Sequence, residues 1–354
     1  MGDQVLAFRP ISYFGRLATG RTGDSLEEIA VDRWTVSPGV RRYIPPARYL
    51  PNQMERIRAA EFGSVAEVVR GLRGDYETSQ SPTYGFRLKD AELIDGAVYA
   101  GKSRISLRSR QRRMPVYRRP RESMAQGAMF ESWMGNRWFG MWLLDDCLTY
   151  QLAQDCGTPV RTVSVGSAHQ HEYISSLALQ AKSVSDMHFD ELFLFADAGH
   201  NDGRRARADA AKRRLNAARS APQRHPGVFL LRGNSGERRV LVNELEIAEQ
   251  LARHRGFRVV DPASATLAQL IDACAGANVV AGVEGSHLAH GLTIMANDAA
   301  LFVLQPPDRV VSVLKVITDR QGQRYGFVVG EGSRDGFHLT WNDVARSLDL
   351  VEQA

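Results

Sequence analysis

From Met124 to the C-terminus, short apolar segments of strand length alternate with segments that have the spacing of amphipathic helices. The predicted strands are Pro159–Val165, Glu191–Ala196, Gly227–Arg232, Arg258–Asp261, Asn278–Gly282 and Ala300–Leu304. The predicted helices are Phe130–Leu152, Asp202–Ser220, Glu244–Arg255, Ala265–Ala275 and His287–Met295. Short buried strands that alternate with helices are typical of βαβ units, so we expect an α/β fold with open, mainly parallel sheets.

Residues 1–105 follow a different pattern, in which prolines interrupt short apolar segments. Ser64 can cap a helix that ends near Arg73, and Ala91–Tyr99 predicts a hairpin that turns at Asp95-Gly96. The Pro222–Pro226 segment is the best domain boundary. We therefore expect three parts: an irregular, partly β N-terminal region over residues 1–105, and two α/β lobes over residues 106–221 and 222–354.

The composition is that of a globular protein that buries a core, with 44% apolar and 24% charged residues in a chain of 354. No apolar segment approaches the roughly 18 residues that a membrane-spanning helix needs. The N-terminus lacks the pattern of a secretory signal. The three cysteines match no zinc-binding spacing, so we expect free thiols in a reducing compartment. These features together predict a cytoplasmic protein.

The net charge of +5 predicts attraction to anions, and the segment Lys102–Arg121 carries nine Lys or Arg and no acidic residue. This segment fits a solvated loop or edge strand, a contact to phosphate or to an anionic acceptor, or a weak membrane-surface contact. Nucleic-acid binding is a further alternative. However, Tyr117 is the only aromatic residue in the segment, whereas single-strand binders use several for stacking.

Two strand-to-helix turns near the C-terminus have the composition of a phosphate site. The strand Gly227–Leu231 leads into Arg232 and the loop at residues 233–239, and the strand Asn278–Ala281 leads into Gly282-Val283-Glu284-Gly285-Ser286-His287. Glycines let a phosphate approach the backbone, and a helix start offers free N–H groups. Arginine side chains supply forked donors for a diphosphate. In open α/β sheets, ligands bind beyond the carboxyl ends of the strands, where both turns would lie.

The order of these residues resembles glycosyltransferase family 61, and in particular its bacterial members, which are often described as capsular polysaccharide biosynthesis proteins. The resemblance rests on Arg232, Arg238-Arg239, Asn243-Glu244, Gly256-Phe257, Gln269, Ala277 and Gly282-x-x-Gly285-Ser286-x-Leu288. It extends from about Val228 to Pro306, with a weaker echo from Gly135 to Asp146.

The resemblance implies a GT-B-like fold with two Rossmann-like, parallel-sheet lobes. It also implies transfer of a sugar from a nucleotide-sugar, usually UDP-linked, to a glycan acceptor, with inversion and without a metal or other cofactor. The implied donor-binding residues are Arg232, Arg238, Arg239, Asn243, Glu244, Gly282, Gly285, Ser286 and His287. The implied acceptor-side residues are Asn136, Trp138 and Trp142.

An inverting transfer needs a base that takes the proton of the acceptor hydroxyl. Asp145 and Asp146 are the first candidates and Glu284 is the next. Met141 and Glu284 stand where family members commonly have histidine, which leaves the base open. The cluster His169-Gln170-His171-Glu172 has a spacing that suits a strand, and we expect no metal site there.

We therefore expect a bacterial glycosyltransferase whose partners are a nucleotide-sugar and a glycan acceptor in surface polysaccharide synthesis. The oligomeric state stays open. One alternative is an inactive, glycosyltransferase-like scaffold or binding subunit, which the residues at 141 and 284 motivate. The other is a nucleic-acid-binding protein that uses the basic segment.

Overall fold

The computed structural model describes residues 6–21, 23–112, 117–163, 166–217, 222–233 and 236–353. The chain divides into two compact units, each built from separated segments. Unit 1 comprises Met1–Gly39 and Ser81–Arg207, and unit 2 comprises Val40–Gln80 and Ala208–Ala354. Residues 1–105 thus contribute to both units. The three-part division and its boundaries stay a prediction.

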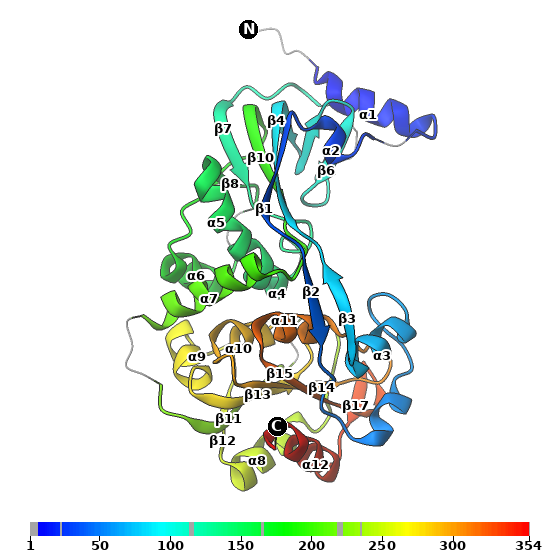
Figure 1. Cartoon of the computed structure of the whole chain (residues 1–354), viewed down its shortest axis with the longest axis vertical. Helices are drawn as coiled ribbons and strands as arrows, with labels where there is room; N and C mark the ends of the chain where they lie inside the picture. The colour runs from blue at the N-terminus through cyan, green and yellow to red at the C-terminus, as the bar shows by residue number, and fades with distance from the viewer. Residues whose placement is uncertain are drawn as a thin grey trace. The chain divides into compact units, whose positions relative to one another are not determined.

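The described part of unit 1 is built on an eight-stranded sheet (Figure 1). Its strands are β1 (Asp32–Ser37), β4 (Thr83–Ile94), β5 (Ala97–Ala100), β6 (Ser103–Ser106), β7 (Ser123–Met129), β8 (Thr158–Arg161), β9 (Lys182–Ser183) and β10 (Met187–Ala196). Along the order β10-β7-β8-β9 the neighbours are parallel, whereas β1, β4, β5 and β6 join antiparallel. The sheet is therefore mixed, not parallel as expected.

The cause of this difference is the N-terminal region, whose strands β1, β4 and β5 join this sheet in antiparallel pairs. The predicted hairpin is confirmed: Ile94 pairs with Ala97, and the two turn residues Asp95 and Gly96 have φ of 48° and 74°. Two consecutive positive φ angles are typical of the tight turn whose twist matches that of a β-ribbon. Because β4 continues this hairpin alongside β10, the antiparallel strands and the parallel strands share one sheet.

The helices of unit 1 are α1 (Phe8–Ala18), α2 (Leu26–Ile29), α4 (Phe139–Met141), the π-helix η2 (Trp142–Asp146), α5 (Cys147–Cys156) and α6 (Ala168–Leu177). The helix expected over Phe130–Leu152 thus begins only at Phe139, and a π-helical turn interrupts it. His169-Gln170-His171-Glu172 lies in α6, so the expectation of a strand there is wrong. The cause is a capping box of Ser167 and Gln170, which starts a helix at this point.

Unit 2 is built on a five-stranded parallel sheet in the order β12-β11-β13-β14-β15. The strands are β11 (His225–Leu230), β12 (Phe257–Val260), β13 (Ala277–Val283), β14 (Ala300–Gln305) and β15 (Arg324–Val329). Numbered along the chain, this is the doubly wound order 2-1-3-4-5. The predicted alternation of strands and helices is confirmed here, and of the five strands of this sheet only β15 was not predicted. The predicted strand Pro159–Val165 and helix Asp202–Ser220 extend into residues outside the described ranges.

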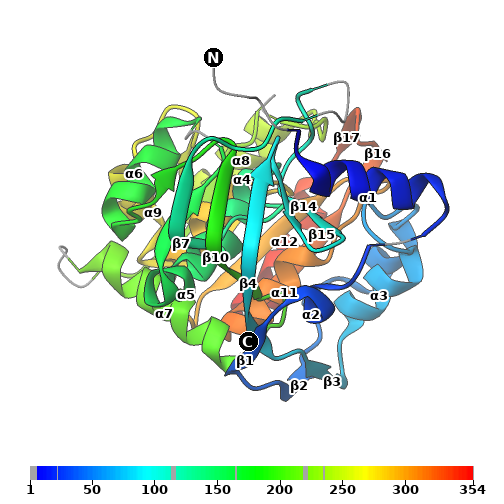
Figure 2. The same ribbon diagram turned by 90° about the horizontal axis from the view of Figure 1, so that it is seen from above.

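Helices cover both faces of the unit 2 sheet, as Figure 1 shows. Helices α8 (Glu244–Arg255) and α12 (Trp341–Glu352) lie on one face, and α9 (Leu267–Cys274), α10 (Leu288–Ile294) and α11 (Val313–Gln321) lie on the other. The remaining elements are β2 (Val40–Ile44), η1 (Pro51–Arg56), α3 (Val65–Arg73), β3 (Tyr76–Gln80), β16 (Glu331–Ser333) and β17 (Gly336–His338). Helix α7 (Asp202–Asn216), labelled in Figure 2, contains the division between the units, which falls after Arg207. No helix of the described ranges has the length and hydropathy needed to cross a bilayer.

Candidate functional site

The carboxyl ends of β11 and β13 form the topological switch point of the unit 2 sheet. From β11 the chain crosses to β12 on one side, and from β12 it returns to β13 on the other side. Ligands of doubly wound proteins bind in the crevice that such a reversal leaves. Arg232 follows β11 and Gly285 follows β13, so the two segments that the sequence marked meet at this point.

The Arg232 guanidinium lies directly against the Gly285 backbone. A methyl group at Gly285 would come within 3.2 Å of Arg232 Cζ, closer still to Nη1, and within 3.0 Å of His287 Nδ1. Only a residue without a side chain allows this approach. Arg232 also donates to the backbone carbonyl of Glu237. Burial, followed by the neighbouring Arg239, lowers the pKa of Arg232 to about 10.

Arg239 belongs to a buried ion network around Glu284. The Arg239 Nε lies 2.9 Å from Glu284 Oε2, and the Arg309 Nη1 lies 3.1 Å from the same oxygen. Arg309 also contacts Glu237 at 2.8 Å and Glu61 at 3.0 Å. Glu284 therefore holds two arginines in place at the crevice. Its pairing with arginine is one of the conditions under which a carboxylate can lie beside a diphosphate.

Glu244, the first residue of α8, fixes the loop after β11. Its two carboxylate oxygens accept the backbone N–H groups of Arg232, at 2.8 Å, and of Gly233, at 3.0 Å. Burial raises the pKa of Glu244, and these two hydrogen bonds oppose that effect. The neighbouring Asn243 amide is bound on both sides by the backbone of Leu339. The Glu244 and Asn243 side chains thus fix the backbone near the site through hydrogen bonds.

The other predicted donor residues differ in exposure. The Arg238 side chain is 78% exposed and lies 3.5 Å from Asp335, so it points away from the Arg239 network. Ser286 and His287 are half-buried and immediately precede α10. Burial and the Arg232 charge lower the pKa of His287 to about 3, so its imidazole is neutral near pH 7. At Gly282 a side chain would meet the Leu230 carbonyl at 2.7 Å.

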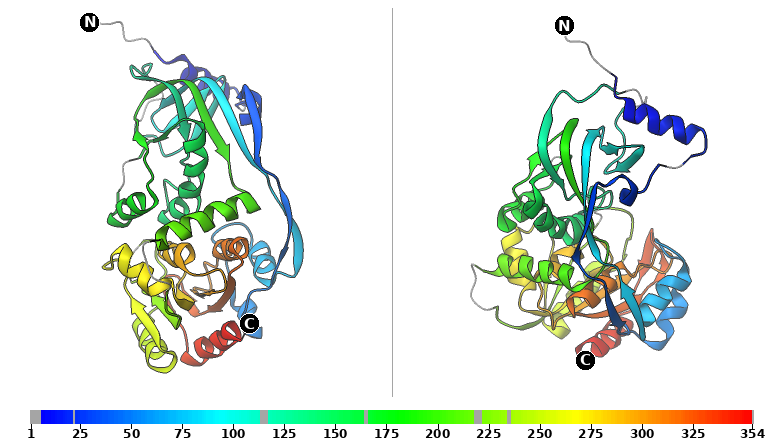
Figure 3. Two further views of the ribbon diagram at one scale, coloured as in Figure 1. Left: turned by 60° about the vertical axis from the view of Figure 1, so that its left-hand side comes forward. Right: turned by 45° about the horizontal axis from the view of Figure 1, so that its top comes forward.

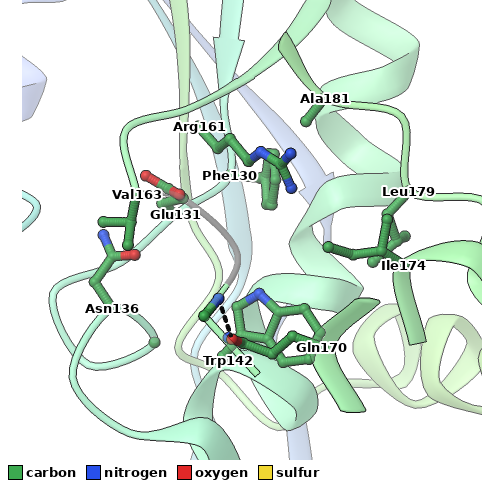
Figure 4. Close-up of a pocket in the computed structure, with 12 residues that line it drawn as sticks. Phe130, Glu131, Asn136, Trp142, Arg161, Val163, Gln170, Ile174, Leu179 and Ala181 are labelled. Carbon is green, nitrogen blue, oxygen red and sulfur yellow. Dashed lines mark hydrogen bonds between the residues drawn. The ribbon is translucent and has the colours of Figure 1, made fainter. Parts of the chain in front are cut away.

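Unit 1 contains a cavity of about 180 Å³ at the carboxyl ends of β7 and β8 (Figure 4). Its lining residues are Phe130, Glu131, Gly135, Asn136, Trp142, Arg161, Val163, Gly166, Gln170, Ile174, Leu179 and Ala181. Two of the three predicted acceptor-side residues, Asn136 and Trp142, are among them. Trp138 lies outside the lining, and its ring packs under the Arg137 guanidinium at 4.5 Å. The structure thus gathers aromatic rings, amides, a carboxylate and a guanidinium around one cavity.

Asp145 and Asp146, the first candidates for the base, are both engaged in contacts that stabilise the fold. Asp145 forms an ion pair with Arg204. Asp146 is 1% exposed and accepts hydrogen bonds from the Ser132 hydroxyl at 2.7 Å and the Ser132 N–H at 3.2 Å. A side chain at Gly135 would overlap its carboxylate, at 2.7 Å from Oδ1 and closer to Oδ2. Both lie on the π-helical turn, a feature often found at functional sites.

Glu131 is the carboxylate that lines the cavity, and sequence reasoning missed it. Its Oε2 accepts the Thr162 N–H at 2.7 Å and the Thr162 hydroxyl at 2.8 Å. Burial raises its pKa, and hydrogen bonds from Thr162 and Asn136 oppose this effect. The available signal was its position two residues after β7, since carboxyl ends of parallel strands carry ligand sites. Arg309 was missed too, because it follows no glycine-rich turn.

Comparison with known proteins identifies the class. The sequence profile described as Glycosyltransferase 61 matches residues 44–302. The match covers most of the chain, so the protein belongs to glycosyltransferase family 61. It is therefore a glycosyltransferase, an enzyme whose substrates are a sugar donor and an acceptor. No curated protein matches the chain.

Solved structures show only distant likeness. An apo crystal structure of the NADH:FMN oxidoreductase EMOB is 13% identical, with a TM-score of 0.22, over 36% of this chain and 87% of that chain. The metal-soaked Flv1 flavodiiron core from Synechocystis sp. PCC6803 is 8% identical, with a TM-score of 0.27, over 76% of this chain and 64% of that chain. At these scores neither structure bears on the function of this chain. Within the described ranges, no three His, Cys, Asp or Glu residues are grouped to hold a metal ion.

Proposed function

We propose that this glycosyltransferase transfers a sugar from a nucleoside-diphosphate donor, UDP-linked, to a glycan acceptor of a bacterial surface polysaccharide, in the cytoplasm. We further propose a GT-B-type enzyme that inverts the anomeric centre and needs no metal. Family membership supports the class of reaction. The buried arginines at the switch point of unit 2 support a diphosphate donor. The cavity of unit 1, which includes the predicted residues Asn136 and Trp142, supports a sugar acceptor.

The convergence of arginines at the switch point is the observation that carries the donor assignment. Arg232 and Arg239 are both buried, and the Arg239 charge, after burial itself, lowers the pKa of Arg232. Two buried guanidinium groups that repel each other are stabilised by a bound dianion. When the bond from the anomeric carbon to the diphosphate breaks, negative charge develops on the leaving oxygen. Guanidinium groups fixed beforehand stabilise that charge without rearrangement.

We assign the base to Glu131 in preference to Asp145 and Asp146. The Glu131 carboxylate lines the cavity, and Thr162 holds it in one orientation. In the reaction, the acceptor hydroxyl attacks the anomeric carbon and passes its proton to the Glu131 carboxylate. The nucleoside diphosphate leaves with the electron pair of the broken bond. A raised pKa suits this role, because it strengthens the carboxylate as a proton acceptor near neutral pH.

Calorimetric titration with UDP, GDP, CMP and ADP tests the donor assignment. Wild type should bind one of these nucleotides with micromolar affinity, and Arg232→Ala should weaken that binding at least about tenfold. The matched control is Arg253→Ala, which removes an exposed arginine of α8 in the same unit. Arg238→Ala should have a smaller effect than Arg232→Ala, because that side chain is mostly exposed.

The result also decides between the enzyme and the inactive-scaffold alternative. Binding of one nucleotide names the donor class, and turnover of the corresponding nucleotide-sugars can then be measured. A folded protein that binds none of the four nucleotides would contradict the donor site. A protein that binds a nucleotide but neither hydrolyses nor transfers any matching sugar would favour the scaffold.

A further inference from the structure

Helix α1 packs against unit 1 with one face only. On this inner face Tyr13 and Phe14 contact a core cluster that includes Tyr99 and Tyr117, and Pro10 is buried. These contacts hold α1 beside the end of the sheet formed by β5 and β6 (Figure 1). The inner face therefore accounts for the folding of the helix, and among the described residues Phe8 and Ile11 on the opposite face stay exposed.

The outer face of α1 exposes large apolar side chains. Phe8 is 73% exposed and Ile11 is 41% exposed, and the spacing places both on one side of the helix with Gly15. Both panels of Figure 3 show α1 at the periphery of unit 1. Apolar groups that cluster on one exposed helix face mark an interaction site more often than scattered ones do.

Basic side chains are frequent in α1 and in a segment that adjoins it. The described residues of segments 6–21 and 102–121 include eleven Lys or Arg and no Asp or Glu. The two segments adjoin, because the Ala7 N–H donates to the Tyr117 carbonyl at 2.9 Å. The carboxylates that contact these basic residues come from elsewhere in the unit and are Asp24, Asp90, Glu92, Asp95 and Asp186. Positive charge is therefore in excess at this surface.

We propose that α1 and the basic segment 102–121 form a docking surface for an anionic phospholipid membrane. In this arrangement α1 lies in the plane of the interface, with Phe8 and Ile11 among the acyl chains. An amphipathic helix with flanking arginines has the composition of a peripheral membrane anchor. Each basic side chain near an anionic leaflet adds to the attraction. This inference does not depend on the donor site or on Glu131.

The positive charge and the exposed apolar side chains of this surface together favour an anionic membrane over a second copy of the chain or a nucleic acid as the binding partner. A second copy of the chain would bring the same excess of positive charge, and like charges across an interface oppose association. A nucleic acid would match the charge but would give Phe8 and Ile11 no apolar environment. An anionic bilayer complements both features, because its acyl chains accept Phe8 and Ile11 and its headgroups attract the arginines.

Vesicle co-sedimentation of the full chain tests the proposal. We expect wild type to bind vesicles of phosphatidylcholine mixed with phosphatidylglycerol and to stay in solution with phosphatidylcholine alone. The double variant Phe8→Ser, Ile11→Ser should lose at least about tenfold in partitioning to the anionic vesicles. The control Leu245→Ser, Val259→Ser removes side chains that are 67% and 40% exposed in unit 2, and it should bind as wild type does.

A second variant tests the charge. Arg118→Gln, Arg121→Gln changes two exposed arginines, and it should weaken binding and flatten its dependence on salt. Wild type that ignores anionic vesicles would overturn the proposal, as would an apolar double variant that binds unchanged. Circular dichroism shows whether each variant is folded. Sedimentation velocity tests for a dimer instead. If wild type is a dimer that does not bind vesicles, and the Phe8→Ser, Ile11→Ser variant is a monomer, this face binds a second copy of the chain.

Discussion

Replacing Gly285 by alanine perturbs the crevice of unit 2 at one point. The new methyl group would lie 3.2 Å from Arg232 Cζ and closer to Nη1, whereas carbon and nitrogen atoms in contact stay about 3.5 Å apart. The guanidinium must therefore move by more than about 1 Å. Gly285 has no left-handed φ, so the alanine backbone is unstrained.

The expected effect is on binding and not on stability. The moving group is the end of a flexible side chain, and a Gly-to-Ala change stabilises the chain by about 0.4–1 kcal/mol through the unfolded state. The free energy of unfolding should thus change by less than about 1 kcal/mol. In the proposed donor site, a displaced Arg232 would lose charge-assisted hydrogen bonds to the diphosphate that are worth about 1.5–3 kcal/mol. The dissociation constant of the bound nucleotide should therefore rise about 10- to 150-fold.

Calorimetric titration and urea unfolding together measure both quantities. The control is Gly71→Ala in α3, where the new methyl group would meet Ser312 Oγ at an ordinary 3.5 Å. This control should keep the affinity of wild type. If Gly285→Ala binds the nucleotide as tightly as wild type, Arg232 does not contact the phosphates and the reasoning fails. If the free energy of unfolding of Gly285→Ala is several kcal/mol lower than that of wild type, Gly285 is needed for folding and not for binding.

Three further outcomes follow from the buried carboxylates. Glu131→Gln should lower kcat by about 10²- to 10⁴-fold with KM little changed. In a pH–rate profile, wild-type kcat/KM should fall as pH drops through the raised pKa of Glu131. A Glu131→Gln variant with a kcat near that of wild type would contradict the assignment of Glu131 as the base. Burial raises the pKa of Asp146, so its ionisation destabilises the folded protein as pH rises. Asp146→Asn should therefore be more stable than wild type by about 1–2 kcal/mol near pH 7, and this difference should vanish in acid. Equal midpoints of urea unfolding for the two proteins at every pH would refute this prediction. Glu244→Ala should lose about 2–4 kcal/mol in urea unfolding, because two backbone N–H groups lose their acceptors, whereas Glu249→Ala on the exposed side of α8 should change little.

Sequence patterns predicted unit 2 much better than unit 1. In the sheet of unit 2, parallel strands alternate with helices along the chain, so short-range periodicity is enough to locate the strands and the helices. In unit 1, β4 pairs with β10, whose residues lie about a hundred positions away along the chain. Periodicity within a window carries no information on such a pairing. Of the strand pairings in unit 1, only the hairpin at Asp95-Gly96 was predicted, because its residue types impose the turn geometry locally.

In the candidate site, too, some features were predictable from the sequence and others were not. The segments that would meet a diphosphate, at Arg232 and at Gly282–His287, were predictable from their types and order. Their partners were not: Glu284 pairs with Arg239 and Arg309 because β13 and β14 end at the same edge of the sheet. Sequence spacing also treated Arg238 and Arg239 alike, although one side chain is 78% exposed and the other 9%.

The sequence by itself determined the family, the α/β class and the turns at which glycine and arginine stand together, since these depend on residue type and local order. Only the tertiary structure decided which carboxylate faces a cavity. Asp145 and Asp146 are adjacent on a helix and equally acidic by type, yet contacts with Arg204 and Ser132 occupy them. Glu131, an unremarkable residue after β7, lines the cavity because parallel strands that are distant in sequence end side by side.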